Sequence, residues 1–359
     1  MRYTAINLLE EKFRQTAGNG AYSLQKISIP VPNETVKLEG YLCTPHNRAG
    51  YYYNIEHPKK RIVLHYTAGS LGSDLFTLSS DNRHVSVPFV IARDGTIYQL
   101  FSSKFWSGHL GKGLGNTNTG NAQDKCSIGI EISNYGFLTE KSGNLETYYS
   151  RLKNSKGVPG PVDIYCSLTE NEAYEKLINP FRQQVFYAAY TEAQYESLII
   201  LLRYLTARYN IPREFLSESV RYQATNEVLN FKGIVTHINY RVDGKWDIGP
   251  AFKWKKLIEG VQAAEFKLTL QRNLTTRSAE RAIPSEQQLE SLLPKAKDAA
   301  MEDEPYEEIQ RTNGDEELNE NKNERSDRQK KEDAIKTTND HHGKSHNLRS
   351  KNKTSTRKG

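Results

Sequence analysis

Two histidines and an aspartate in this sequence have the residue types that hold a catalytic metal ion. His65 ends an apolar run at residues 61–65, His237 ends a second run at 233–237, and Asp247 follows shortly after. A catalytic zinc ion takes three protein ligands of these types and keeps a fourth position for water. The three residues therefore predict an open zinc site. The alternative is a pair of hydrogen-bonded core histidines and an aspartate that caps a turn.

A hydrolytic metal site also needs a proton acceptor and a positive charge for the developing oxyanion. At residues 127–132 isoleucines alternate with other residues, so Glu131 lies on the polar face of the expected strand. A buried glutamate is costly unless water, a metal site or a donor meets it, and we predict Glu131 to be the base. Only Trp246 separates Lys245 from Asp247, so in an extended segment both side chains leave the backbone on the same side. We predict that Lys245 stabilises the oxyanion; the alternative is a solvated loop lysine.

The elements expected around these residues are short apolar strands and one long helix. The Asp94-Gly95 pair between two β-rich runs predicts a hairpin. Thr191 predicts the N-cap of an amphipathic helix that packs on the sheet. Residues 140–190 are polar and rich in turn signals, and we expect them to be irregular. The expected strands are 61–65, 87–92, 96–100, 127–132 and 233–237, and a short closing helix is expected at 251–261.

Composition divides the 359 residues into three parts. Aromatic residues are dense up to Phe266, and beyond it only Tyr306 remains. We therefore predict a catalytic domain at 58–265, an N-terminal extension of unassigned role at 1–57, and a charged, disordered tail at 266–359. Three cysteines are too few and too scattered for a disulfide framework.

The formal net charge of +6 does not predict a nucleic-acid partner. Residues 343–359 carry six basic residues and no acidic one, whereas residues 302–318 carry eight acidic residues and one arginine. The basic excess therefore belongs to the end of the tail and not to a folded face. The N-terminus shows no signal peptide and no segment reaches membrane-spanning length. We expect a cytoplasmic protein, or one released by lysis or by non-classical secretion.

Several segments together resemble the type 2 N-acetylmuramoyl-L-alanine amidase family, which includes the peptidoglycan recognition proteins. They lie in order within about residues 58–262 and comprise 65–69, 89–100, 127–132 and 237–250. The resemblance implies an α/β fold with a central mixed sheet flanked by helices. It also implies one zinc ion and hydrolysis of the amide between N-acetylmuramic acid and L-alanine in peptidoglycan or its fragments. The family's ligands fall on His65, His237 and Asp247, its catalytic glutamate on Glu131 and its lysine on Lys245.

One further segment, residues 105–111, resembles the tryptophan- and histidine-containing stretch that lines the family's cleft. His109 in this segment is expected to bind substrate, with support of the site as the alternative. Pro88 stands where many members have a histidine, so that side chain's contribution is absent.

The alternative function is a recognition module that binds peptidoglycan without cutting it. Such relatives are expected to lack part of the ligand set, and the full set here favours hydrolysis.

Overall fold

The computed structural model of the chain describes residues 1–153 and 157–266. The tail predicted for residues 266–359 lies outside these ranges from residue 267 onward. Within the ranges, no helix is both long enough and apolar enough to cross a membrane.

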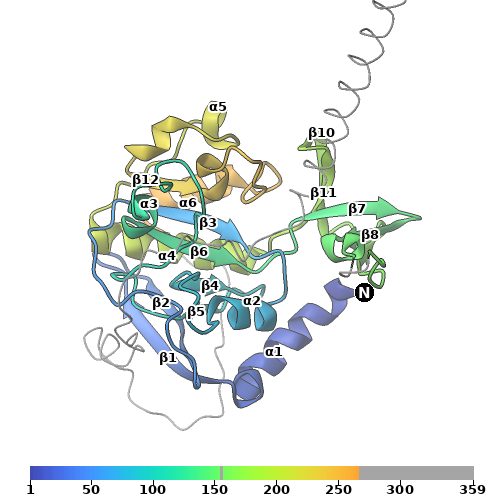
Figure 1. Cartoon of the computed structure of the whole chain (residues 1–359), viewed down its shortest axis with the longest axis horizontal. Coiled ribbons are helices and arrows are strands. Elements are labelled where there is room, and N and C mark those ends of the chain that lie inside the picture. Colours follow the sequence, from blue (N-terminus) through green and yellow to red (C-terminus); the bar gives the residue numbers. More distant parts are fainter. Residues whose placement is uncertain (154–156, 267–359) are drawn as a thin grey trace, which may run out of the picture. The chain divides into compact units, whose positions relative to one another are not determined.

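A mixed seven-stranded sheet holds the candidate site (Figure 1). Its strands follow the order β1 (Tyr22–Pro30), β2 (Lys37–Pro45), β5 (Ile97–Gln99), β4 (Phe89–Ile91), β6 (Ser127–Ile132), β3 (Arg61–Tyr66) and β12 (Gly233–Thr236). The four strands β4, β6, β3 and β12 run parallel to one another, whereas β4 and β5 form an antiparallel hairpin. The α/β fold with a mixed sheet that the sequence predicted is confirmed.

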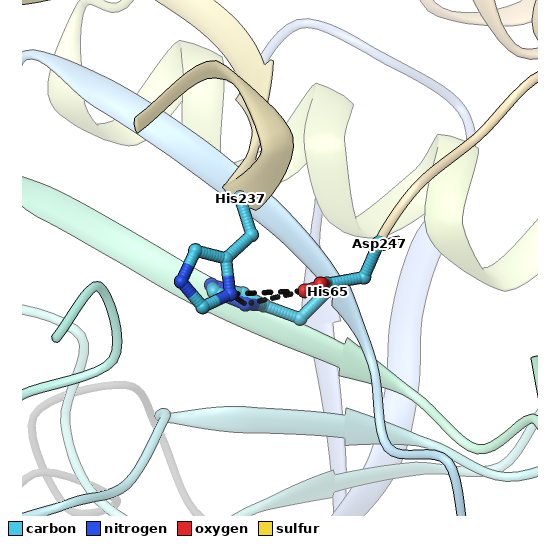
Figure 2. A group of neighbouring side chains, drawn as sticks. All are labelled: His65, His237 and Asp247. Carbon is cyan, nitrogen blue, oxygen red and sulfur yellow. Dashed lines mark hydrogen bonds and ion pairs between the residues drawn. The ribbon is translucent and has the colours of Figure 1, made fainter. Parts of the chain in front are cut away.

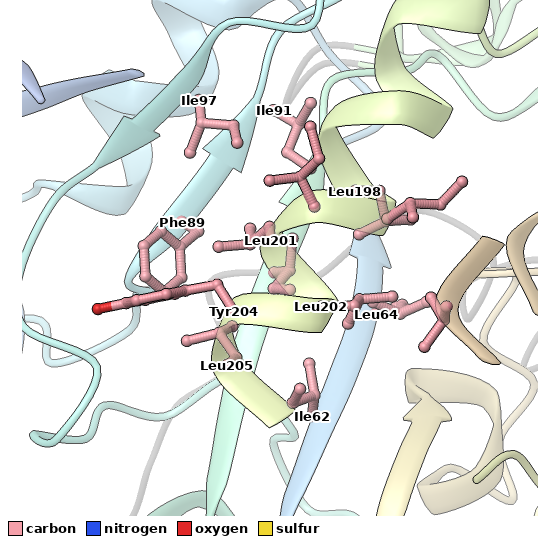
Figure 3. Packing of buried hydrophobic residues seen from close by; sticks show 14 of the residues in the cluster. Ile62, Leu64, Phe89, Ile91, Ile97, Leu198, Leu201, Leu202, Tyr204 and Leu205 are labelled. Carbon is pink, nitrogen blue, oxygen red and sulfur yellow. The ribbon is translucent and has the colours of Figure 1, made fainter. Parts of the chain in front are cut away.

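One long helix, α4 (Glu192–Tyr209), covers one face of this sheet together with α6 (Trp254–Gln262). Thr191 and Gln194 form the expected capping box, and Asn210 ends the helix in a left-handed conformation. Alternate residues of each strand point to opposite faces, so the strand residues between the core positions point away from α4. Figure 3 shows the packing of Leu198, Leu201, Leu202 and Leu205 against Ile62, Leu64, Phe89 and Ile91.

A second sheet, antiparallel and five-stranded, occupies residues 137–188. Its order is β10 (Tyr174–Phe181), β11 (Gln184–Ala188), β7 (Phe137–Lys141), β8 (Asn144–Thr147) and β9 (Ile164–Ser167). The expectation that residues 140–190 are irregular was therefore wrong. The strands are short and partly exposed, so they lack the continuous apolar runs of strands that are buried on both faces.

The N-terminal residues link the two sheets through α1 (Arg2–Gly20). At the start of this helix Arg2 forms an ion pair with Asp163, next to β9, with the two charged atoms 2.7 Å apart. Nearer its end Phe13 packs on Tyr98 of β5, with ring centroids 5.8 Å apart. Figure 1 shows α1 running from the region of β8 to β1. Residues 1–57 thus supply a helix that touches both sheets and two strands, β1 and β2, of the larger one.

Short helices complete the described residues. They are α2 (Leu71–Leu78), α3 (Ala122–Lys125), η1 (Tyr148–Arg151), α5 (Glu218–Arg221), η2 (Asn226–Leu229) and η3 (His237–Tyr240).

Candidate metal centre

Strand direction brings the predicted ligands to one place. The strands β6, β3 and β12 are parallel, so their carboxyl ends lie at the same edge of the sheet. His65 lies near the end of β3, and His237 follows β12 as the first residue of η3. Asp247 comes from the loop after η3. Figure 2 shows the three side chains pointing toward one another from these elements.

The ligand atoms of the three residues form a compact triangle. Nδ1 of His65 lies 3.1 Å from Nδ1 of His237 and 3.1 Å from Oδ2 of Asp247, and His237 Nδ1 lies 3.0 Å from the same oxygen. Atoms that bind a tetrahedral zinc ion at about 2.0–2.2 Å lie roughly 3.3 Å from one another. The separations therefore fit a shared ion, and all three residues are buried.

The protonation states also suit metal ligands, which must be neutral imidazoles and a carboxylate. Burial lowers the pKa of His237 to about 4, despite the opposing effect of Asp247. Burial alone would raise the pKa of Asp247, but the charges and hydrogen bonds of His237 and His65 outweigh it and hold the pKa well below the usual range. Asp247 is therefore ionised and His237 neutral near pH 7.

Glu131 lies directly beside the triangle. In the parallel pairing of β3 and β6 it is the partner of His65. Its side chain is buried, and Oε2 finds no hydrogen-bond partner among the residues that the structure describes. Burial raises the pKa of this carboxyl well above its ordinary value, Asp247 and Asp74 raise it further, and the charge of Lys245 lowers it.

Lys245 is partly exposed and lies in the same loop as Asp247. Its positive charge lowers the pKa of both Glu131 and His237, so the ammonium is within electrostatic reach of the site. The structure thus brings the two predicted catalytic residues to the same edge of the sheet as the three ligands.

His109 packs against His65 and uses both of its ring nitrogens. Nδ1 of His109 lies 2.9 Å from Nε2 of His65, and Nε2 of His109 lies 2.9 Å from Oγ of Ser127. Burial lowers the pKa of His109 well below its ordinary value, and the neighbouring His65 and His237 lower it further. A neutral His109 accepts a hydrogen bond from Nε2–H of His65 and donates one through its own Nε2–H to Ser127. Ser127 donates in turn to the carbonyl of Gln123, at 2.8 Å.

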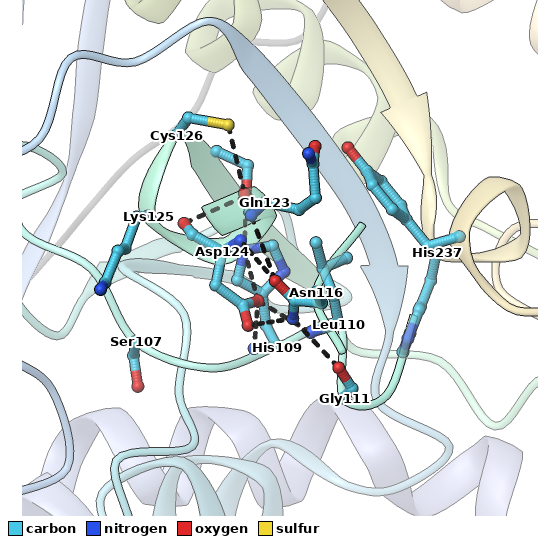
Figure 4. Close-up of polar contacts among 12 residues, drawn as sticks. Ser107, His109, Leu110, Gly111, Asn116, Gln123, Asp124, Lys125, Cys126 and His237 are labelled. Carbon is cyan, nitrogen blue, oxygen red and sulfur yellow. Dashed lines mark hydrogen bonds and ion pairs between the residues drawn. The ribbon is translucent and has the colours of Figure 1, made fainter. Parts of the chain in front are cut away.

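Two residues that the sequence analysis did not single out hold this segment in place (Figure 4). Oδ1 of Asp124 accepts the backbone N–H groups of His109 and Leu110, both at 3.0 Å. Asn116 donates its side-chain amide to Oδ2 of Asp124 at 2.6 Å. Gly129 leaves room for this packing, since a Cβ there would lie 2.5 Å from Val87 and 3.2 Å from the ring of His109. In the sequence, this arrangement is signalled only by the alternation at residues 127–132, which puts Ser127 and Gly129 on the same face of the strand.

A comparison with known protein families identifies the family of this chain. The family model for N-acetylmuramoyl-L-alanine amidase matches residues 56–250. No curated protein sequence matches the chain.

Similar solved structures carry amidase names, at low similarity. The amidase AmiD from E. coli, solved with anhydro-N-acetylmuramic acid-L-Ala-D-gamma-Glu-L-Lys, is 22% identical with a TM-score of 0.34, and the match covers 65% of this chain and 65% of AmiD. AMPDH3 from Pseudomonas aeruginosa is 18% identical with a TM-score of 0.33, covering 57% of this chain and 61% of its own. LysC from Clostridium intestinale is 16% identical with a TM-score of 0.29, covering 60% of this chain and 93% of its own. At these values the structural similarities carry no argument about substrate.

Proposed function

The chain belongs to the N-acetylmuramoyl-L-alanine amidase family, and from that premise we propose that it is a zinc-dependent amidase. Its substrate is the amide between N-acetylmuramic acid and L-alanine in peptidoglycan or its fragments. The observation that carries the proposal is the triangle of His65, His237 and Asp247, with ligand atoms 3.0–3.1 Å apart beside a buried glutamate.

Three side chains would hold the zinc ion: the two histidines through Nδ1 and Asp247 through Oδ2. When bound, zinc lowers the pKa of water and polarises a carbonyl oxygen. The parallel strand ends fix the two histidines, and the loop from Lys245 brings in the aspartate. Because all three side chains are buried, the protein keeps bulk water away from the atoms that would bind the ion.

Glu131 acts as the general base and acid in this proposal. It removes a proton from the attacking water and delivers that proton to the amide nitrogen as the carbon–nitrogen bond breaks, so that L-alanine leaves with a free amino group. Lys245 offsets the negative charge that develops on the carbonyl oxygen. Its electrostatic effect on Glu131 and His237 supports a place near that oxygen.

For His109 the sequence predicted substrate binding, with support of the site as the alternative. We propose the supporting role, because its two ring nitrogens already contact His65 and Ser127. An imidazole that binds a metal commonly donates its other N–H to a second group, which fixes the ring's tautomer and orientation. His109 provides that group for His65.

The test is product analysis with and without the metal. The full chain, loaded with one equivalent of zinc, is incubated with purified peptidoglycan and with soluble muramyl peptides, and the products are identified by mass spectrometry. We expect free peptides that begin with L-alanine, loss of these products after chelation, and their return when zinc is added.

A recognition module without catalysis would bind the same muramyl peptides and release no peptide. Cleavage at a different bond, or full activity after chelation with no zinc left in the protein, would overturn the proposal. Measuring zinc content on the same samples separates loss of metal from loss of fold.

A further inference from the structure

The five-stranded sheet presents aromatic rings to the loop that carries Lys245 and Asp247. Trp246, which lies between those two residues, packs on Phe137 of β7 with ring centroids 4.7 Å apart. It also meets Phe181, at the end of β10, edge-on at 6.3 Å. All three rings are partly exposed. We call Phe137, Phe181 and Trp246 the aromatic wall.

Two arginines lie over the rings of this wall. The guanidinium of Arg182 lies 5.3 Å from the ring centre of Phe181, and that of Arg151 lies 5.6 Å from Phe137. Arg151 also donates to Oγ1 of Thr139 at 2.6 Å. Neither arginine forms an ion pair with a carboxylate within residues 1–153 and 157–266. The wall therefore carries two positive charges without an acidic partner in the described part of the chain.

The position of Arg182 is fixed by a tight turn. Arg182 and Gln183 connect β10 and β11 with φ angles of 50° and 66°, the left-handed values of a two-residue hairpin turn. The hydroxyl of Tyr187 donates to the carbonyl of Phe181 at 2.9 Å, and this hydrogen bond stabilises the turn. The guanidinium then lies against the backbone of Gly244, where an added Cβ would be 2.5 Å from Nη1.

The electrostatic surroundings of Arg182 place it near the metal centre. Burial lowers the pKa of Arg182, and Tyr187, Asp247 and Asp243 act in the opposite direction. Both carboxylates have other partners: Asp247 contacts the two histidines, and Asp243 pairs with Arg241. The guanidinium of Arg182 is thus partly desolvated, lies close to the candidate metal centre, and is available to bind an anion from a ligand.

We propose that Arg182, with Arg151 further along the aromatic wall, binds a carboxylate in the peptide part of the substrate. This inference rests on the proposed function, because the peptide attached to N-acetylmuramic acid is what would lie beside Asp247. A glutamate linked through its γ-carboxyl keeps a free α-carboxylate, and the peptide ends in another. A guanidinium binds a carboxylate through two parallel hydrogen bonds, and neighbouring rings that exclude water strengthen them.

Calorimetric binding tests the inference without turnover. The probes are the tripeptide L-Ala-γ-D-Glu-L-Lys and the same tripeptide with both carboxylates converted to carboxamides. We expect the wild-type protein to bind the carboxylate form about tenfold more tightly, a typical value for one charge-assisted contact. Arg182→Gln should lose this preference, Arg182→Lys should retain part of it, and Arg151→Gln should reduce it less. Lys255→Gln is the matched control, since Lys255 is 88% exposed and lies on α6.

Steady-state kinetics on the matching muramyl tripeptides supplies the second readout. Arg182→Gln should raise KM about tenfold for the carboxylate substrate, with kcat within twofold, and leave KM for the amidated substrate unchanged. Equal binding of the two peptides by the wild-type protein, or an equal loss of both in Arg182→Gln, would overturn the inference. If the wild-type protein prefers the carboxylate peptide but cleaves no muramyl peptide, the wall is supported and the amidase proposal fails.

Discussion

The two sheets of this protein place their charged residues in opposite surroundings. At one edge of the seven-stranded sheet, His65 and Glu131 of the sheet and Asp247 of the neighbouring loop are buried, and burial and nearby charges shift the pKa values of the two carboxyls. In the five-stranded sheet, Arg151 and Arg182 lie over partly exposed rings. Buried, mutually oriented groups suit bond cleavage, whereas accessible charges on apolar rings suit recognition. The comparison agrees with our two proposals, which place the chemistry at the edge of one sheet and substrate binding beside the other.

Removing a metal ligand should have the largest effect of any single change. Asp247→Asn and His237→Ala should each abolish stoichiometric zinc binding. Each should also lower kcat/KM about a thousandfold, which corresponds to a loss of several kcal/mol of transition-state stabilisation. Zinc content and peptide release from muramyl substrates measure the two effects. His46→Ala is the matched control, because the side chain of this exposed histidine forms hydrogen bonds with Ser23 and the carbonyl of Gly20. Normal zinc content in either ligand variant would contradict the assignment of the metal centre.

Replacing the proposed base, Glu131, should lower turnover without removing the metal, and it therefore separates the chemical step from metal binding. Glu131→Gln keeps the shape of the side chain and should retain zinc while lowering kcat by about 10² to 10⁴, the usual contribution of a general base. Glu259→Gln on α6 changes the same charge at an exposed position and should leave kcat unchanged. Turnover near the wild-type level in Glu131→Gln would remove Glu131 from the mechanism.

The meeting of His65, His237 and Asp247 was predictable because local sequence signals mark the strand ends that carry the two histidines. His65 and His237 each end an apolar run, and Glu131 lies on the polar face of a strand with regular alternation. Parallel strands then bring such ends together without further information. The geometry of the ligand triangle agrees with that prediction, and the roles of Glu131 and Lys245 stay predictions until they are measured.

The five-stranded sheet was not predictable in the same way. Its strands are short and their burial does not alternate regularly, and β10 and β8 contain register irregularities. The proposed role of Arg182 depends on its turn meeting Gly244, a contact between distant segments that no local pattern encodes. The run Val185-Phe186-Tyr187 was the available signal for a strand. The support of His109 by Asp124 also depends on a fold-level contact.

The contact between α1 and the hairpin of the larger sheet should depend on pH. Glu10 is buried and accepts the backbone N–H groups of Arg93 and Asp94, yet burial raises its pKa to about 7 from an unfolded value of 4.5. Between these values the folded state holds more protons than the unfolded state, so the free energy of unfolding falls as pH rises. We expect a loss of about 3 kcal/mol between pH 4.5 and 8.

Chemical denaturation at a series of pH values checks this loss. Glu10→Gln should flatten the decline, whereas Glu11→Gln, at the neighbouring exposed position, should leave it unchanged. A decline of equal size in wild type and Glu10→Gln would mean that another group carries the pH dependence. Because α1 touches both sheets, the same series also shows whether they unfold in one transition.

The smallest of these effects concerns His109 and decides between its two candidate roles. His109→Ala leaves the Nε2 proton of His65 without its acceptor, and zinc affinity should fall about 10- to 100-fold, as for other partners of metal-binding histidines. Ser127→Ala, which removes the next contact, should weaken zinc binding less. Competition with a chelator measures both, and His57→Ala, a partly exposed histidine outside the site, is the control. If zinc affinity is unchanged and KM rises instead, His109 binds substrate, and recognition would then extend into the seven-stranded sheet.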